Sequence, residues 1–465
     1  MPVRPRRFSI SVILVATTFH LLSVGVVSAG RETLAEVLEA ARQANPRLAA
    51  ARASAAAGRA GVSVARAGWL PTVTAFADAG VATDPRAPTL AAGVGQRPAG
   101  FGATVSVPIL DGGRTTSAVK AAGANASAER ETARLTDQQV LLATVSAFAN
   151  VRLSRRLVRL NRAAVGRLVA TQEATVRRVA AKEATVADVA QAEAALAGAR
   201  ARHELLASQV AGAEAAFQAL VQRRPGDLAP PPTVDGIVPA TASEAIGEAV
   251  RAGPSVAVAL YRQLAAEYAV ARARAELMPT LSLEGRYSRR YDVPTIAEDP
   301  TGLSARAVVT VPLSASNIAA VDVAVHAHAA ARLQAEDAKS EARRAATESF
   351  AQLVAKRAAL GALRAQAAAS RKALDGVSRE AKVGQRTVFE VVTAQQTVLA
   401  AETALAEGER DLVLAGFGLL ALVGRLEPAA LAAPGAKPNR MTGPVGRPWR
   451  ISVRKASRHD VPGVR

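Results

Sequence analysis

The residues that most often carry chemistry are few in this sequence, and their spacing does not suit catalysis. The chain has no cysteine, which excludes disulfides, thiolate metal sites and cysteine nucleophiles. His326 and His328 are two residues apart, so on a helix they lie on different faces and are poorly placed to share a metal ion. The run Asp111-Gly112-Gly113-Arg114 lacks the lysine and hydroxyl of a phosphate-binding loop. We interpret it as a tight strand exit whose aspartate caps a helix, and we expect neither an enzyme nor a bound metal or cofactor.

The N-terminus predicts export. Three arginines precede an apolar run from Phe8 to Val27, which closes on the small residues Ser28 and Ala29. This arrangement is typical of a secretory signal peptide over residues 1–29. The alternative is an uncleaved membrane anchor, against which the small residues at the cleavage position argue. No later segment is long and apolar enough for a transmembrane helix.

The net charge of +19 invites a nucleic-acid hypothesis, which the rest of the sequence does not favour. The arginines of the central region are dispersed among glutamates, and aromatic residues make up only 3% of the chain, so stacking platforms are scarce. A signal peptide also conflicts with a nucleic-acid partner. We interpret the charged positions as solvated helix faces, and residues 428–465 as a basic, disordered tail.

Short motifs recur in the same order 202 to 208 residues apart. This duplication predicts two equivalent structural units, residues 30–225 and 241–427, joined by a linker over residues 226–240. The paired segments are Trp69-Leu70-Pro71-Thr72 with Leu277-Met278-Pro279-Thr280, Val107-Pro108-Ile109 with Val311-Pro312-Leu313, Asn45-Pro46 with Gly253-Pro254, and Thr185-Val186-Ala187-Asp188 with Thr387-Val388-Phe389-Glu390.

Long stretches without proline predict very long helices. None occurs between Pro108 and Pro225 or between Pro312 and Pro428, and both stretches are rich in good helix formers. In the second, apolar residues at heptad spacing predict a coiled-coil seam. Each stretch breaks once, near residues 181–184 and 383–386, so a long helix is followed by a shorter returning one. The helical run 33–68 has the length that the returning helix lacks, so we expect the two to stack end to end along the long helix.

Each unit also contains two segments in which apolar and polar residues alternate. They fall near residues 72–81, 101–110, 281–288 and 304–313. An ordinary half-buried sheet would show the same pattern. Behind a signal peptide and beside very long helices, we favour a membrane barrel that faces lipid outside and water inside. Four strands cannot close a barrel alone, so copies must share one, and three copies would supply twelve strands.

These features together resemble the TolC family of outer-membrane channel proteins over residues 30–427. The carrying motifs are the duplicated strand starts, the run from Val107 to Arg114, and the tip from Val383 to Val391 with Ala394-Gln395-Gln396 after it. The resemblance implies a homotrimer whose strands form one β-barrel in the outer membrane and whose helices form a coiled-coil barrel extending into the periplasm. It further implies docking to a periplasmic adaptor and an inner-membrane transporter, for efflux or type I secretion.

The same resemblance implies roles for residues at the two helical tips. Arg386 and Asp188 match positions that hold the entrance closed, and Glu390 matches an acid that lines the pore. Thr393 stands where a second acid is usual. Gly384 matches the tip-turn glycine, whereas Lys182 replaces it in the first unit, where a left-handed turn costs more. The alternative for Arg386 and Asp188 is a pair of solvated charges near helix ends.

We therefore expect the chain to be a subunit of a passive export duct. The rival from another class is a periplasmic coiled-coil adaptor or scaffold that never enters the outer membrane. The four alternating segments favour the duct, because an adaptor would need compact globular modules in their place.

Overall fold

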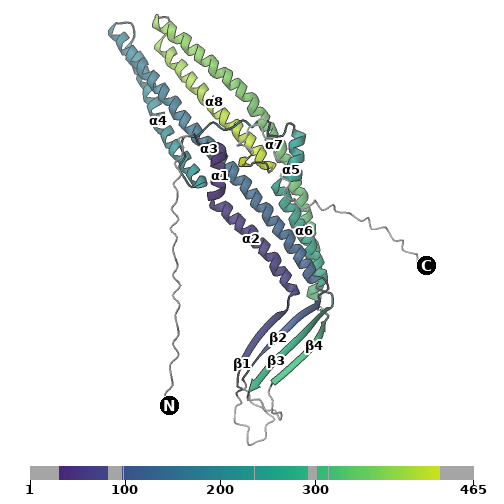
Figure 1. Ribbon diagram of the computed structural model, residues 1–465. Helices are drawn as coiled ribbons and strands as arrows, with labels where there is room; N and C mark the ends of the chain where they lie inside the picture. The colour runs from purple at the N-terminus through teal and green to yellow at the C-terminus, as the bar shows by residue number, and fades with distance from the viewer. Residues whose placement is uncertain are drawn as a thin grey trace, which may run out of the picture.

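The computed structural model describes residues 31–81, 97, 99–234, 236–291, 301–312 and 314–429. The molecule is elongated, with a small sheet at one end and two helical hairpins reaching the other (Figure 1). The predicted signal peptide (1–29) and nearly all of the predicted basic tail, from residue 430 on, lie outside the described residues. The two halves have the same order of elements: two shorter helices, two strands, a long helix and a returning helix.

Eight α-helices account for most of the described chain. They are α1 (Leu34–Ala44), α2 (Pro46–Arg66), α3 (Arg114–Ala180), α4 (Val186–Val221), α5 (Ala242–Ala252), α6 (Pro254–Ala275), α7 (Ala315–Lys382) and α8 (Val388–Leu422). The 67 residues of α3 and the 68 of α7 extend over about 100 Å each at about 1.5 Å per residue. The two predicted long helices are confirmed.

The predicted continuous helix over residues 33–68 is wrong in one respect. It breaks at Asn45, whose side chain accepts hydrogen bonds from the N–H groups of Arg47 and Leu48 and so caps α2. Pro46 occupies the first position of α2, where its missing N–H leaves no partner unsatisfied. A short 3₁₀ turn, η1 (Ala67–Trp69), then ends the segment.

The helices pack as the lengths predict. Helices α1, α2 and α4 all contact α3, and α5, α6 and α8 all contact α7. In Figure 1, α4 and α2 lie along successive parts of α3. The heptad residues Leu353, Leu360 and Ala367 of α7 are buried. Helix α3 also packs against α6 and α8, so the two halves share one helical body.

All four predicted strands form, in one antiparallel sheet of order β1-β2-β3-β4. The strands are β1 (Thr72–Ala79), β2 (Ala99–Leu110), β3 (Thr280–Tyr291) and β4 (Thr301–Thr310). The central β2–β3 pairing joins the two halves, with Ala103 opposite Tyr287. In the register, Val73, Val105 and Ala305 share one face, whereas Thr72, Glu284 and Arg306 share the other. Most side chains on both faces are exposed, and within the described chain no strand pairs with the outer edge of β1 or β4.

The main apolar core lies midway along the helices, where α1, α3, α4 and α8 meet the segment that joins the two halves. Phe148, Phe217 and Phe417 are fully buried there. Leu228 and Val234 of the joining segment close this core, and Val234 packs so tightly on Gly416 that a β-carbon on Gly416 would lie 2.5 Å from it. The core therefore holds elements of both halves together near the middle of the long helix α3.

Candidate functional site

The two ends of the helical hairpins, which we call the first tip (α3–α4) and the second tip (α7–α8), contain every site residue that the sequence predicted. They lie at the end of the molecule remote from the sheet (Figure 1). Both turns are built alike: a left-handed residue ends the long helix, and a threonine three residues later starts the returning helix.

At the first tip, Lys182 adopts the left-handed conformation with φ of 61°. The N–H of Glu183 then donates to the carbonyl of Arg178 at 2.8 Å and closes the end of α3. Thr185 begins α4: its hydroxyl accepts the N–H of Asp188 at 3.2 Å, and its own N–H donates to the Asp188 carboxylate at 2.9 Å. Asp188 is thus one half of a reciprocal helix cap.

At the second tip, Gly384 is left-handed with φ of 78°, and the N–H of Gln385 donates to the carbonyl of Glu380 at 3.0 Å. Thr387 and Glu390 form the same reciprocal cap at the start of α8. The other oxygen of Glu390 accepts Nη1 of Arg386 at 2.7 Å, while Nε of Arg386 donates to Glu380 at 2.7 Å. Arg386 therefore ties the two helices of its own hairpin together.

The predicted partners Arg386 and Asp188 do not contact each other within one chain. Each is bound to groups of its own tip, and whether they meet between copies stays a prediction. Thr393 lies exposed one turn after Glu390 on α8, and its carbonyl accepts the hydroxyl of Thr397 at 2.9 Å.

The environments of these charged groups reinforce their ionised forms. The Thr185 N–H and hydroxyl hydrogen bonds lower the pKa of Asp188. The Thr387 N–H, followed by Arg386, lowers the pKa of Glu390. Hydrogen bonds to Glu380 and Glu390 raise the pKa of the Arg386 guanidinium. All three groups are charged at neutral pH, so the tips present fixed charges.

A contact between the two hairpins was not predicted. Val388 and Val392 of α8 pack on Leu168 and on the apolar residues of α4. Next to them, the buried Gln395 donates from Nε2 to the Thr171 hydroxyl of α3 at 3.0 Å. Gln395 belongs to a motif that the sequence analysis singled out, but the approach of α8 to α3 is a tertiary contact with no local signal.

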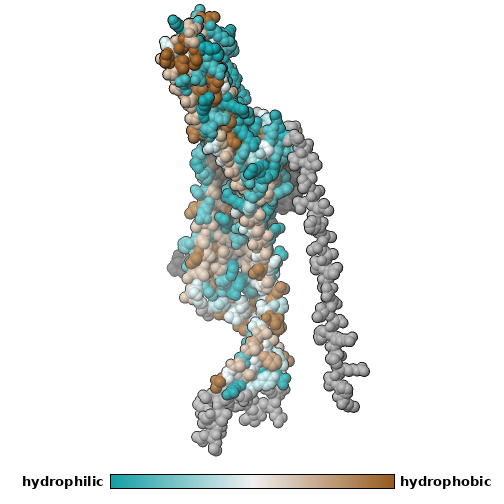
Figure 2. Space-filling model, turned by 90° about the vertical axis from the view of Figure 1, so that its left-hand side faces the viewer, coloured by the Kyte–Doolittle hydropathy of each residue, from teal (hydrophilic) through white to brown (hydrophobic). Residues whose placement is uncertain are grey.

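The tips also expose apolar side chains. Val186 is 77% exposed, Val383 71% and Phe389 56%. Figure 2 shows apolar side chains gathered at this end of the molecule. Soluble surfaces rarely group large apolar residues, and exposed ones of this kind are common at interaction surfaces.

No cluster of three or more His, Cys, Asp or Glu side chains that could hold a metal ion occurs in the described ranges. Among the described helices, none has a segment apolar and long enough to cross a bilayer.

Comparisons with known proteins agree with this architecture. The family described as outer membrane efflux protein matches residues 37–221 and 245–425. The outer membrane efflux protein BepC of Brucella suis biovar 1 (strain 1330) is 29% identical over 398 residues, covering 85% of this chain and 86% of that protein.

Solved structures match at lower identity, which shows the fold alone. A membrane protein from Pseudomonas aeruginosa has a TM-score of 0.74 at 23% identity, with 84% of this chain and 93% of that one covered. The open state of the MtrE outer membrane channel of Neisseria gonorrhoeae has a TM-score of 0.70 at 21% identity, with coverage of 85% and 90%.

Proposed function

The chain belongs to the outer membrane efflux protein family, and from that premise we propose that three copies close one duct through the outer membrane and across the periplasm. Membership makes it an outer-membrane efflux channel that extends into the periplasm, and the adaptor alternative is not favoured. The assembly, the partners and the roles of individual residues are our proposals.

The main support for a trimer comes from the exposed, unpaired sheet. A four-stranded sheet with both faces exposed and both edges unpaired in the described chain is not a stable end point, because unpaired strand edges in lipid are not tolerated. Leu303 and Val309, 83% and 66% exposed, share one face, and Glu284 and Arg306 form an ion pair at 2.8 Å on the other. Lipid outside and water inside would satisfy both faces once β4 of one copy pairs with β1 of the next.

The absence of cysteine makes this pairing directly testable. We expect Ala75→Cys in β1, combined with Cys at position 303, 305 or 307 of β4, to give disulfide-linked trimers on oxidation. Ala75→Cys with Gly285→Cys is the matched control, because β2 separates these two positions in the sheet. A monomer by native mass measurement, with no cross-link from any β4 position, would refute the shared barrel.

The duplicated order of elements supports two equivalent units in each copy, so three copies would bring six helical hairpins around one axis. We further propose that the exposed apolar tip residues Val186, Val383 and Phe389 dock the duct onto a periplasmic adaptor and, with it, an inner-membrane transporter. Co-purification of the transporter complex with the native protein and with Phe389→Ser tests this docking, and equal recovery would contradict it.

For the tips themselves, we propose that Arg386 and Asp188 keep the entrance narrow and that Glu390 selects for cations in the pore. In support of these roles, hydrogen bonds at the two tips favour the ionised forms of Asp188, Arg386 and Glu390. Thr393, one turn on, offers a hydroxyl where a second acid would strengthen that preference. The contact between Gln395 and Thr171 would have to part if the second hairpin moves away from the first.

A further inference from the structure

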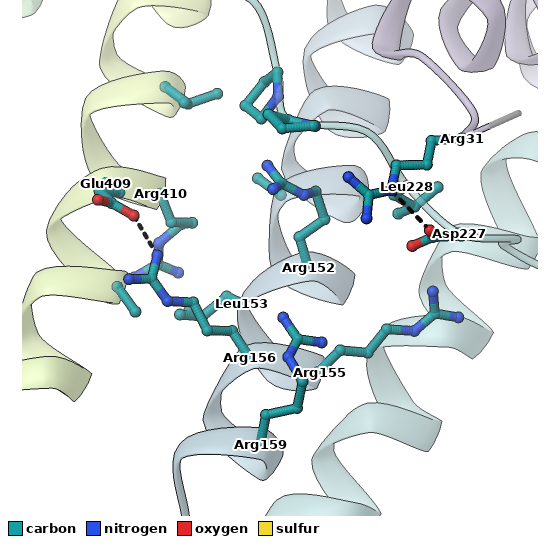
Figure 3. A pocket seen from close by; sticks show the side chains of 15 residues that line it. Arg31, Arg152, Leu153, Arg155, Arg156, Arg159, Asp227, Leu228, Glu409 and Arg410 are labelled. Atoms are coloured by element: carbon teal, nitrogen blue, oxygen red, sulfur yellow. Dashed lines mark hydrogen bonds and ion pairs between the residues drawn. The ribbon is translucent and has the colours of Figure 1, made fainter. Parts of the chain in front are cut away.

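A cavity of about 600 Å³ lies midway along the molecule, beside the main core and remote from both the sheet and the tips. It is lined by helices α3 and α8, by Arg31, and by residues 227, 228, 230 and 231 of the joining segment (Figure 3). All of the residues that line it belong to one chain.

Six arginines line this cavity, and four of them come from one face of α3. Their spacing of i, i+3, i+4 and i+7 places them side by side on that helix. In Figure 3 these four side chains rise from α3 between α8 and the joining segment. The six residues are Arg31, Arg152, Arg155, Arg156, Arg159 and Arg410.

Four of the six arginines have an acidic partner, and two do not. The paired ones are Arg31 with Asp227, Arg155 with Glu214, Arg156 with Glu409, and Arg410 with Asp411. Two of these acids, Glu214 and Asp411, do not line the cavity, and Asp411 also pairs with Lys356, so the cavity itself carries excess positive charge. Within the described ranges, neither Arg152 nor Arg159 has a hydrogen-bond or ion-pair partner.

Of the two arginines without a partner, Arg152 is half-buried. Burial, followed by the charge of Arg156, lowers the pKa of its guanidinium, although the weaker effect of the Glu409 charge acts in the opposite direction. An arginine nevertheless stays protonated in proteins, so the site must bear the repulsion between neighbouring guanidinium groups. A bound anion would relieve it.

We infer that this cavity binds a soluble anion carrying a phosphate group with at least two negative charges, held between the guanidinium groups of Arg152 and Arg159. Planar guanidinium groups match phosphate oxygens with paired N–H donors. The volume lies within the range of small-molecule sites. Leu153, Leu228 and Pro230 supply an apolar wall for the organic part of such an anion.

The position of the cavity excludes a lipid headgroup of the membrane that would hold the sheet. Arg152 lies 38 residues after Arg114, where α3 leaves the sheet, which is about 57 Å of helix at about 1.5 Å per residue. A bilayer that holds the sheet cannot present its phosphates at that distance. We therefore assign the site to a soluble anion.

Titration calorimetry of the purified, assembled protein with pyrophosphate tests the inference. We expect saturable binding that weakens at least tenfold in Arg152→Gln and in Arg159→Gln. Arg162→Gln is the matched control: it removes the same charge from an exposed position of α3 that does not line the cavity. Absence of binding, or an equal loss in all three variants, would overturn the site.

Two further measurements use the unaltered protein and so test the site even if the variants fail to assemble. A density map of the unaltered protein with pyrophosphate should show the anion between Arg152 and Arg159, whereas an acidic side chain of a second copy in that place would overturn the proposal. In nanodiscs, replacing phosphatidylcholine by phosphatidylglycerol should leave the pyrophosphate affinity unchanged. Competition by the anionic lipid would assign the site to a headgroup instead.

Discussion

The two tip turns differ at one decisive position, and exchanging the residues there measures what the turn conformation contributes. Lys182 and Gly384 are both left-handed, with φ of 61° and 78°. That conformation costs an L-residue about 1–2 kcal/mol, whereas glycine gives up about 0.4–1 kcal/mol through its freedom in the unfolded chain. No atom lies within 4 Å of a β-carbon built on Gly384, so packing adds nothing. We expect Lys182→Gly to stabilise the first tip, and Gly384→Lys to destabilise the second, by about 1 kcal/mol each.

Amide hydrogen exchange reports this difference locally. The Glu183 N–H to Arg178 carbonyl bond and the Gln385 N–H to Glu380 carbonyl bond both depend on the left-handed residue before the donor. A change of about 1 kcal/mol alters a local opening equilibrium about fivefold. Exchange at residue 183 should therefore slow about fivefold in Lys182→Gly, and exchange at residue 385 should quicken about fivefold in Gly384→Lys.

Lys182→Ala separates backbone conformation from charge, because alanine keeps the β-carbon and loses the ammonium group. We expect it to leave exchange at residue 183 unchanged. If alanine slowed exchange as much as glycine, the effect would come from removing a positive charge near Arg178, and the conformational reasoning would be refuted.

Four further predictions concern the pore and the core. Arg386→Ala and Asp188→Ala should each raise single-channel conductance in planar bilayers, and the double variant should add little if the two side chains meet between copies; additive increases would show that they act separately. Glu390→Gln should lower cation preference in reversal-potential measurements with little change in conductance. Hydrogen bonding depresses the folded pKa of Glu390 below its ordinary 4.5. The unaltered protein should therefore keep its cation preference and the helix cap of α8 above pH 4.5, and lose both as the pH falls below that value. Loss of the cation preference already at about pH 6 would contradict this. Gln138→Leu should destabilise the protein by about 2–5 kcal/mol, because the buried N–H and carbonyl of Leu426, which Gln138 binds at 3.0 and 3.1 Å, lose their partner. Gln139→Leu, at an exposed position of the same helix, should change the melting temperature little.

The features that the sequence predicted well have local periodicities. The proline-free stretches predicted α3 and α7, and alternation predicted all four strands, because side chains repeat every 3.6 residues in a helix and every two in a strand. The break at Asn45 also had a local signal, since an asparagine before a proline is a typical helix start. At the matching Gly253-Pro254, where α5 ends and α6 begins, proline again occupies the first position of the helix, but Gly253 supplies no side-chain cap.

What the sequence did not predict depends on how distant segments meet. The arginines of α3 were interpreted as a solvated face, although Arg152, Arg155, Arg156 and Arg159 are spaced to share one side of the helix. That side becomes a cavity wall only because α8 and the joining segment lie across it. Likewise, Arg386 is bound by Glu380 from the preceding helix, a partner that the tip motif alone does not specify.

The central β2–β3 pairing has a consequence for how the chain reaches its native state. Ala103 and Tyr287 are opposite each other although 184 residues separate them in the sequence. Closing so long a loop carries a large entropic cost, and high contact order slows folding. The β1–β2 and β3–β4 hairpins would each be marginal alone in water, so neither half has an autonomous sheet despite the matching order of elements. We therefore expect the helical body, through contacts such as α3 with α6, to assemble first and bring the two hairpins within reach, which leaves sheet formation as a late, rate-limiting event.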